Sequence, residues 1–142
     1  MNNLEKYKDK VYRIIGAAMT VHTELGGGLL EPIYNEALHL ELLDRGIENE
    51  PEKTLNCYYK GHKLEKYYRM DIVAEDIIIE LKATDDILPE HRLQLFNYMR
   101  LTKMPIGLLL NFGIKSMYGE RYYYDPITNE CHLLDKSLNP YK

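Results

Sequence analysis

The stretch YYRMDIVAEDIIIELKA, residues 67–83, contains two short runs of apolar and β-branched residues separated by Glu75-Asp76. Isoleucine and valine favour pleated strands, and polar residues between two such runs are typical of a turn. The stretch therefore predicts two consecutive strands, residues 67–73 and 77–83, joined through a turn.

Two carboxylates, one on each predicted strand, are the most informative residues of this stretch. If the turn holds an even number of residues, Asp71 lies directly opposite Glu80, with Cβ atoms about 5 Å apart on one face of the sheet. Like charges at this spacing repel, and the apolar neighbours remove both groups partly from water, which strengthens the repulsion. A divalent cation would resolve the conflict, and carboxylates with several waters are the usual ligands of Mg²⁺.

Lys82 follows Glu80 by two residues, so strand alternation places its ammonium group on the same face as both acids. The alternative is an exposed Glu80–Lys82 ion pair, with Asp71 merely near a turn. An odd turn length would also remove the facing geometry. On these three residues alone, both interpretations stay open.

The residues before this hairpin have helical periodicity. Apolar side chains recur every three or four positions over residues 4–25 and predict a long helix that ends at Gly26-Gly27-Gly28. A second helix is predicted to begin near Glu31-Pro32 and to end at Gly46, because proline suits the first helical turn. An acid at this position is either a partner of the helix dipole or a functional group.

Further strands are predicted on both sides of the hairpin. Residues 57–59 precede a turn at Lys60-Gly61-His62, and with the hairpin they form a three-stranded meander. Ile106–Phe112 is apolar almost throughout, which is typical of a central strand covered on both faces. Residues 122–124 predict one more strand, and residues 125–142 are interpreted as an irregular tail.

A third helix is predicted from Pro89 to Thr102, because proline is favoured in the first turn and Lys103-Met104-Pro105 terminates the pattern. Gln94 and Tyr98 are four residues apart on this helix and share a face with His91. Such a polar stripe is usually solvated, and the alternative is that it belongs to a functional site.

Length and composition restrict the class of protein. The 142 residues fit one domain, and no apolar run approaches the roughly 20 residues of a membrane span. The start MNNLEK lacks the features of a secretory signal, so a cytoplasmic location without a membrane partner is expected. Two cysteines and the lack of a paired-histidine motif argue against a disulfide scaffold and against zinc.

Several short motifs form a specific set through their order and spacing. The first is Gly28-Leu29-Leu30-Glu31-Pro32-Ile33-Tyr34. The others, within about residues 10–115, are Val21-His22 with Glu24-Leu25-Gly26, Arg69-Met70-Asp71, Ile79-Glu80-Leu81-Lys82-Ala83, Gln94-Leu95 with Asn97-Tyr98, and Gly107-Leu108-Leu109 with Asn111-Phe112-Gly113. Together they resemble the GxxExxY proteins of the PD-(D/E)XK nuclease superfamily, with Met70 in place of the proline of the superfamily's name.

This resemblance implies an α/β fold with a restriction-endonuclease-like core, in the order α-β-β-β-α-β, whose central mixed sheet is flanked by helices. It implies one domain over residues 1–142, with its core at about residues 10–125 and an irregular C-terminal tail. The implied activity is hydrolysis of nucleic-acid phosphodiester bonds with Mg²⁺ or Mn²⁺. The implied metal ligands are Asp71, Glu80, the carbonyl of Leu81 and Glu31. Lys82 would be the catalytic lysine, with Gln94 and Tyr98 supporting the site.

The alternative function is a binding or assembly module that keeps the fold without turnover. The net charge of −4 favours it, because phosphate contacts normally come from clustered Lys and Arg. Bound metal ions would change the local charge, however, and a module without turnover has no reason to keep facing acids. The expected partner is nucleic acid, DNA before RNA, and a homodimer stays open. Glu31, Gln94 and Tyr98 are expected on the same side of the sheet as Lys82.

Overall fold

Six strands form one sheet in the computed structural model. The structure describes residues 4–141, so Met1, Asn2, Asn3 and Lys142 lie outside the described residues. The first three residues of the start MNNLEK, on which the expectation about a secretory signal rests, are among them. The strands lie in the sheet in chain order: β1 (Glu50–Tyr59), β2 (His62–Ala74), β3 (Ile77–Lys82), β4 (Ile106–Phe112), β5 (Met117–Asp125) and β6 (Glu130–Leu134). β3 and β4 are parallel, and the other neighbouring pairs among these strands are antiparallel. The sheet is therefore mixed, as predicted.

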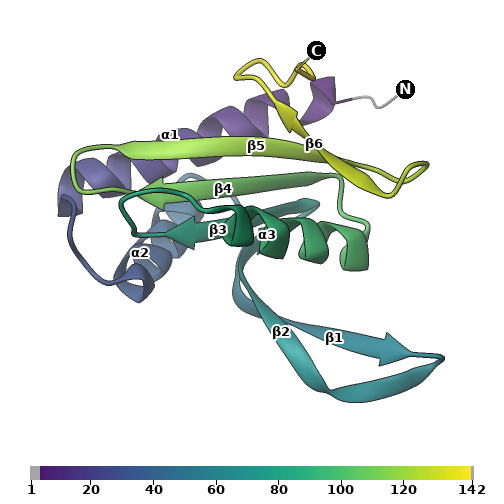
Figure 1. Cartoon of the computed structure of the whole chain (residues 1–142). Coiled ribbons are helices and arrows are strands. Elements are labelled where there is room, and N and C mark those ends of the chain that lie inside the picture. The colour runs from purple at the N-terminus through teal and green to yellow at the C-terminus, as the bar shows by residue number, and fades with distance from the viewer. Residues whose placement is uncertain (1–3, 142) are drawn as a thin grey trace.

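Helices cover both faces of this sheet (Figure 1). The 3₁₀ helix η1 (Glu5–Tyr7) leads into α1 (Lys8–Leu25), which packs with α2 (Glu31–Asp44) on one face, whereas α3 (Pro89–Thr102) packs on the other. Alternation along β3 shows the two layers, because Ile77 and Ile79 join the core under α1 and α2 while Ile78 joins the core under α3. The predicted α/β fold and element order are confirmed.

The helix ends follow from local backbone chemistry. α1 ends at Gly26, whose φ of 73° lies in the left-handed region that glycine tolerates best. α2 and α3 each begin with a proline in the first turn, where its missing N–H costs no helical hydrogen bond. Lys103 then closes α3 in a left-handed conformation, with φ of 63°. No helix within residues 4–141 is both long enough and apolar enough to cross a membrane.

The centre of the sheet is the parallel pair β3 and β4, which α3 connects as a crossover. All seven residues of β4 are buried, and β3 is buried up to Leu81. Burial on both faces explains the unbroken apolar run of Ile106–Phe112, and the predicted central strand is confirmed.

The β2–β3 hairpin has a two-residue turn, Glu75–Asp76, and its strands pair over only three positions. The pairs are Ile72 with Ile79, Val73 with Ile78 and Ala74 with Ile77. Beyond this point β2 leaves β3 and pairs only with β1, and the two strands project from the body of the sheet (Figure 1). The gap that opens between β2 and β3 lies at Asp71 and Glu80.

Three predictions about strands are corrected by the structure. β1 begins at Glu50 instead of at Cys57, β2 begins at His62, for which the sequence predicts a turn, and β5 is longer than residues 122–124. The tail is not irregular throughout, because β6 pairs with β5 over Glu130–Leu134. β1 is an edge strand, where Pro51 is tolerated, and β6 buries only Leu134 deeply, so neither strand carries a strong alternating pattern.

Candidate active site

Asp71 and Glu80 lie side by side where β2 separates from β3. The backbone N–H of Asp71 donates to Oε2 of Glu80 at 2.8 Å, and the backbone N–H of Leu81 donates to Oδ2 of Asp71 at 2.9 Å. The carboxylates therefore accept hydrogen bonds where the ladder between the two strands ends. The even turn length gives the register that brings these acids opposite each other.

Burial controls the protonation of this pair. Burial, with a smaller contribution from the charge of Glu31, raises the pKa of Asp71 to about 6 against the lowering effect of the Leu81 N–H. Glu80 is only 3% exposed, and burial together with the neighbouring Asp71 raises its pKa well above the ordinary value. Two adjacent negative charges are thus unfavourable here, and a bound cation or proton would be favoured.

Lys82, at the end of β3, is half-buried, and its charge lowers the pKa of both Asp71 and Glu80. Its ammonium group forms no hydrogen bond or ion pair within residues 4–141. The group is therefore close enough to act on the carboxylate pair electrostatically while its three donors stay available to another anion.

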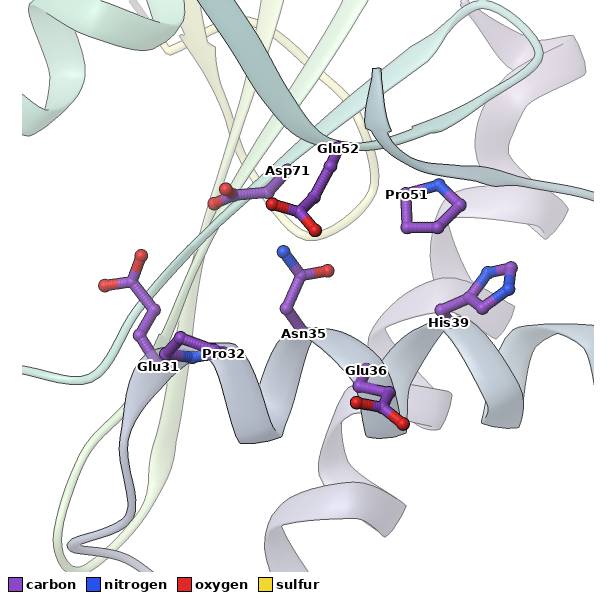
Figure 2. A pocket seen from close by; sticks show the side chains of 8 residues that line it. All are labelled: Glu31, Pro32, Asn35, Glu36, His39, Pro51, Glu52 and Asp71. Carbon is purple, nitrogen blue, oxygen red and sulfur yellow. The ribbon is translucent and has the colours of Figure 1, made fainter. Parts of the chain in front are cut away.

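Glu31 approaches the pair from the first turn of α2. A cavity of about 290 Å³ separates α2 from the start of β1 and from Asp71. Figure 2 shows Glu31 and Asn35 extending from α2 toward Asp71 and Glu52, whereas Glu36 points away from them. The structure thus brings Glu31 to the same cavity as Asp71.

Asn35 and Glu52 were not predicted from the sequence. The side-chain oxygen of Asn35 is buried and has no hydrogen-bond partner within the described residues. Glu52 has a φ of 48° and lies across from Asp71, since the flanking positions pair as Pro51 with Ile72 and Lys53 with Met70. Asn35 could have been found from its i+4 spacing to Glu31, but Glu52 gave no signal because β1 was not expected to reach it.

Tyr98 borders the carboxylate pair from α3. Its ring is buried, its hydroxyl accepts a hydrogen bond from Nε2 of Gln94 at 2.7 Å, and it donates to the carbonyl of Arg69 at 3.3 Å. Burial raises the pKa of Tyr98, and the charges of Glu80 and Asp71 add to this effect. Gln94 is exposed and reaches the site through Tyr98, while Nδ1 of His91 accepts the N–H of Leu88 at the start of the helix.

One expectation about the site is wrong. Glu31, Gln94 and Tyr98 do not lie on one side of the sheet, because α2 and α3 cover opposite faces. They approach the carboxylate pair from the two faces, at the point where the β2–β3 ladder has ended.

The donor atoms suit a hard divalent cation. Within residues 4–141, no three His, Cys, Asp or Glu side chains converge closely enough to hold a metal ion. The two carboxylates that do converge are oxygen donors, and Asn35, whose side-chain oxygen is buried without a partner among the described residues, lines the same cavity as Asp71. Mg²⁺ is usually bound by one or two carboxylates with several waters, so these residues fit Mg²⁺ or the similar Mn²⁺.

Comparisons with known proteins agree with this fold. A family model described as the PD-(D/E)XK nuclease superfamily matches residues 8–122. The crystal structure of SSO0001 is similar in fold, with a TM-score of 0.53 and 19% sequence identity over 87% of this chain. The match covers 64% of that structure's chain, less than two thirds of its length. No curated protein sequence matches this chain significantly.

Proposed function

The chain belongs to the PD-(D/E)XK nuclease superfamily, and from this membership we propose that it hydrolyses nucleic-acid phosphodiester bonds, DNA before RNA, with Mg²⁺ or Mn²⁺. The observation that carries the proposal is the pair of the half-buried Asp71 and the buried Glu80 in the gap between β2 and β3. Its pKa values are raised by burial, and a divalent cation would compensate both charges.

Asp71, Glu80, the Leu81 carbonyl and Glu31 would hold the cation. The N–H of Leu81 points to Asp71, and the carbonyl of the same strand residue points to the same side, so it also faces the gap. When bound, the cation supplies a Lewis acid that polarises a phosphate oxygen and lowers the pKa of a water molecule. Glu31 would complete the ligand set from α2 through a bridging water molecule, because the three carboxylates do not converge on one point within residues 4–141.

Lys82 would stabilise the negative charge that develops on the phosphate, because its ammonium has no partner within the described residues and lies near both acids. Tyr98 and Gln94 would act as positioning residues. Tyr98 holds the carbonyl of Arg69, two residues before Asp71, and Gln94 fixes the Tyr98 hydroxyl.

Within the superfamily, we propose that the chain belongs to the GxxExxY group, with Gly28, Glu31 and Tyr34 at the named positions. The structure gives this motif a physical role. Gly28 has a φ of 89°, and the buried Tyr34 hydroxyl donates to the carbonyl of Gly26 at 2.6 Å and accepts from the N–H of Leu29 at 3.2 Å. These contacts fix the glycine turn to the start of α2, from which Glu31 extends.

The direct test is cleavage of labelled DNA and RNA, single-stranded and duplex, by the purified chain in Mg²⁺, Mn²⁺ or chelator. Asp71→Asn should lose cleavage and bind Mn²⁺ more weakly in calorimetric titration. Lys82→Ala should lower kcat roughly a hundredfold to a thousandfold while Mn²⁺ affinity stays similar, because the lysine acts mainly on the transition state. Glu36→Gln is the matched control, since this side chain points away from Asp71 (Figure 2).

Two outcomes would contradict the proposal. Undiminished cleavage by Lys82→Ala would indicate a contaminant or a different site. Wild-type protein that binds nucleic acid but never cleaves it with any metal would identify a binding module instead of an enzyme.

A further inference from the structure

β1 and β2 extend beyond the sheet as a two-stranded arm, defined here as residues 53–69. The arm pairs Lys53 with Met70 at its base and Tyr59 with His62 at its tip. Its turn is Lys60–Gly61, where both residues have positive φ, 49° and 80°, which gives a tight hairpin. Figure 1 shows that the arm projects away from α1 and α2 and that its tip stands clear of the sheet.

The charge of the arm is opposite to that of the whole chain. Residues 53–69 contain five Lys and Arg and one Glu, a net charge of +4 in a chain of net charge −4. Near the base, Arg69 lies 4.0 Å from Glu52 and Lys53 lies 3.4 Å from Glu50. Lys60, Lys63 and Lys66 form no ion pair within residues 4–141. This concentrated positive charge favours a polyanionic partner.

Aromatic rings accompany these charges on the arm. Tyr58 and Tyr59 near the tip are 63% and 62% exposed, and Tyr67 is 50% exposed. The amine of Lys60 lies 5.4 Å from the centre of the Tyr59 ring, and the guanidinium of Arg69 lies 5.9 Å from that of Tyr67. Exposed aromatic faces beside cations are the surfaces on which unpaired bases stack, whereas paired bases within a duplex offer no free face to them.

The base of the arm is fixed to the candidate active site. Tyr68 packs edge-on against Tyr98 with ring centres 5.3 Å apart, and the Tyr98 hydroxyl donates to the carbonyl of Arg69. Asp71 follows Arg69 by two residues on the same strand. A nucleic-acid strand with a phosphodiester at Asp71 would therefore have the arm next to it.

We propose that the arm binds single-stranded nucleic acid beside the bond to be cleaved, through phosphate contacts from its lysines and base stacking on its tyrosines. The statement that the bound strand lies beside the cleaved bond rests on the proposed nuclease function. Binding of the strand by the arm does not rest on it, because binding can be measured without cleavage.

The test is fluorescence anisotropy of the full chain with a labelled oligothymidylate of about 20 nucleotides in chelator, which prevents metal-dependent cleavage. Lys63→Glu with Lys66→Glu should weaken binding about tenfold or more and reduce the salt dependence of the affinity. The matched control is Lys8→Glu with Lys136→Glu, which changes the net charge equally at a cavity beside α1 and β5, away from the arm. This control should change the affinity by less than about threefold.

A second variant tests stacking independently of charge. Tyr58→Ala with Tyr59→Ala should weaken binding of the oligothymidylate about tenfold, and it should leave binding of a duplex of the same length nearly unchanged. Circular dichroism of each variant checks that the fold is retained.

Several results would overturn the proposal. Equal losses in the arm and control variants would show unspecific charge effects. A preference for duplex that the tyrosine variant does not change would exclude stacking. Sedimentation showing that the arm variants only dissociate a dimer would identify the arm as a contact between copies of the chain. Arm-dependent binding without any cleavage would contradict the nuclease proposal alone, and cleavage and binding that do not depend on the arm would contradict the arm proposal alone.

Discussion

Glu80 accepts the Asp71 N–H, although burial and the adjacent carboxylate raise its pKa well above the ordinary value. A raised pKa means that the native state binds the proton more tightly than the unfolded chain, so ionisation at neutral pH lowers the free energy of unfolding. This lowering of the free energy of unfolding is absent below about pH 4, where the carboxyl group is protonated in both the native and the unfolded state. It increases as the pH rises. For Asp71 the destabilisation keeps increasing until the pH passes the native-state pKa of about 6.

Glu80→Gln should therefore stabilise the metal-free protein. The amide keeps an acceptor for the Asp71 N–H but carries no charge, so the free energy of unfolding should rise by roughly 1–3 kcal/mol at about pH 8. The gain should vanish near pH 4, and cleavage should be lost. Urea denaturation in chelator at the two pH values measures this. A variant less stable than wild type at the higher pH would show that the carboxylate is stabilised by partners in the native state.

Glu31 and Glu36 form a matched pair on α2, because only Glu31 extends toward Asp71 (Figure 2). Glu31→Gln should lower Mn²⁺ affinity roughly tenfold or more, as expected for a group that ligates or orients a metal. Glu36→Gln should leave the affinity unchanged in the same calorimetric titration. Equal losses would mean that Glu31 contributes only to the overall negative charge of the cavity.

At the scale of elements, predictability followed burial. β3 and β4 are buried on both faces, and their apolar runs identified them from sequence. The outer part of β2, residues 62–69, is exposed on both faces, so no alternation of burial marks it, and the sequence predicts a turn at His62. The sequence led to Asp71 and Glu80 because a local hairpin positions both, whereas Asn35 and Glu52 needed the packing of α2 beside β1 to be known.

Tyr34 tests how the glycine turn is held to α2. Tyr34→Phe removes the hydroxyl that contacts the carbonyl of Gly26 and the N–H of Leu29, and it leaves both backbone groups without that partner. The free energy of unfolding should fall by about 1–3 kcal/mol in urea denaturation. Tyr12→Phe is the control, since Tyr12 is 80% exposed, and it should change stability by less than about 0.5 kcal/mol. Similar losses in both variants would refute a specific role for the Tyr34 hydroxyl.

At the scale of the whole molecule, Glu120 connects the layer of α3 to the sheet. Its carboxylate accepts two hydrogen bonds from Arg92, both at 2.8 Å, one from Tyr118 at 2.9 Å and one from Tyr122 at 2.5 Å. Burial raises the pKa of Glu120, but the hydrogen bonds from these donors outweigh it and hold the pKa below the ordinary value. A lowered carboxylate pKa stabilises the native state above the unfolded-state pKa of about 4.3, and this stabilisation is lost as the pH falls through the lower native value.

Glu120→Gln should thus lower the free energy of unfolding by about 1.5–3 kcal/mol at neutral pH. The difference from wild type should shrink on acidification below about pH 4, because the wild-type carboxylate is then protonated as well. Guanidinium denaturation across this pH range measures the effect. A constant difference at every pH would show that the variant disturbs packing instead of an ionised hydrogen-bond network.

The three residue pairs that join β2 to β3 also divide the molecule into regions of different local stability. Amide hydrogens of β4 lie in the buried centre and should exchange with deuterium only on global unfolding, whereas those near the tip of the arm should exchange through local opening. The boundary between slow and fast exchange should fall at Asp71. Hydrogen-exchange mass spectrometry would locate it, and a cation or oligonucleotide bound there should slow exchange on the arm side. The reactive residues would then stand at the edge of the most rigid part of the protein, with the part that meets the partner free to adjust.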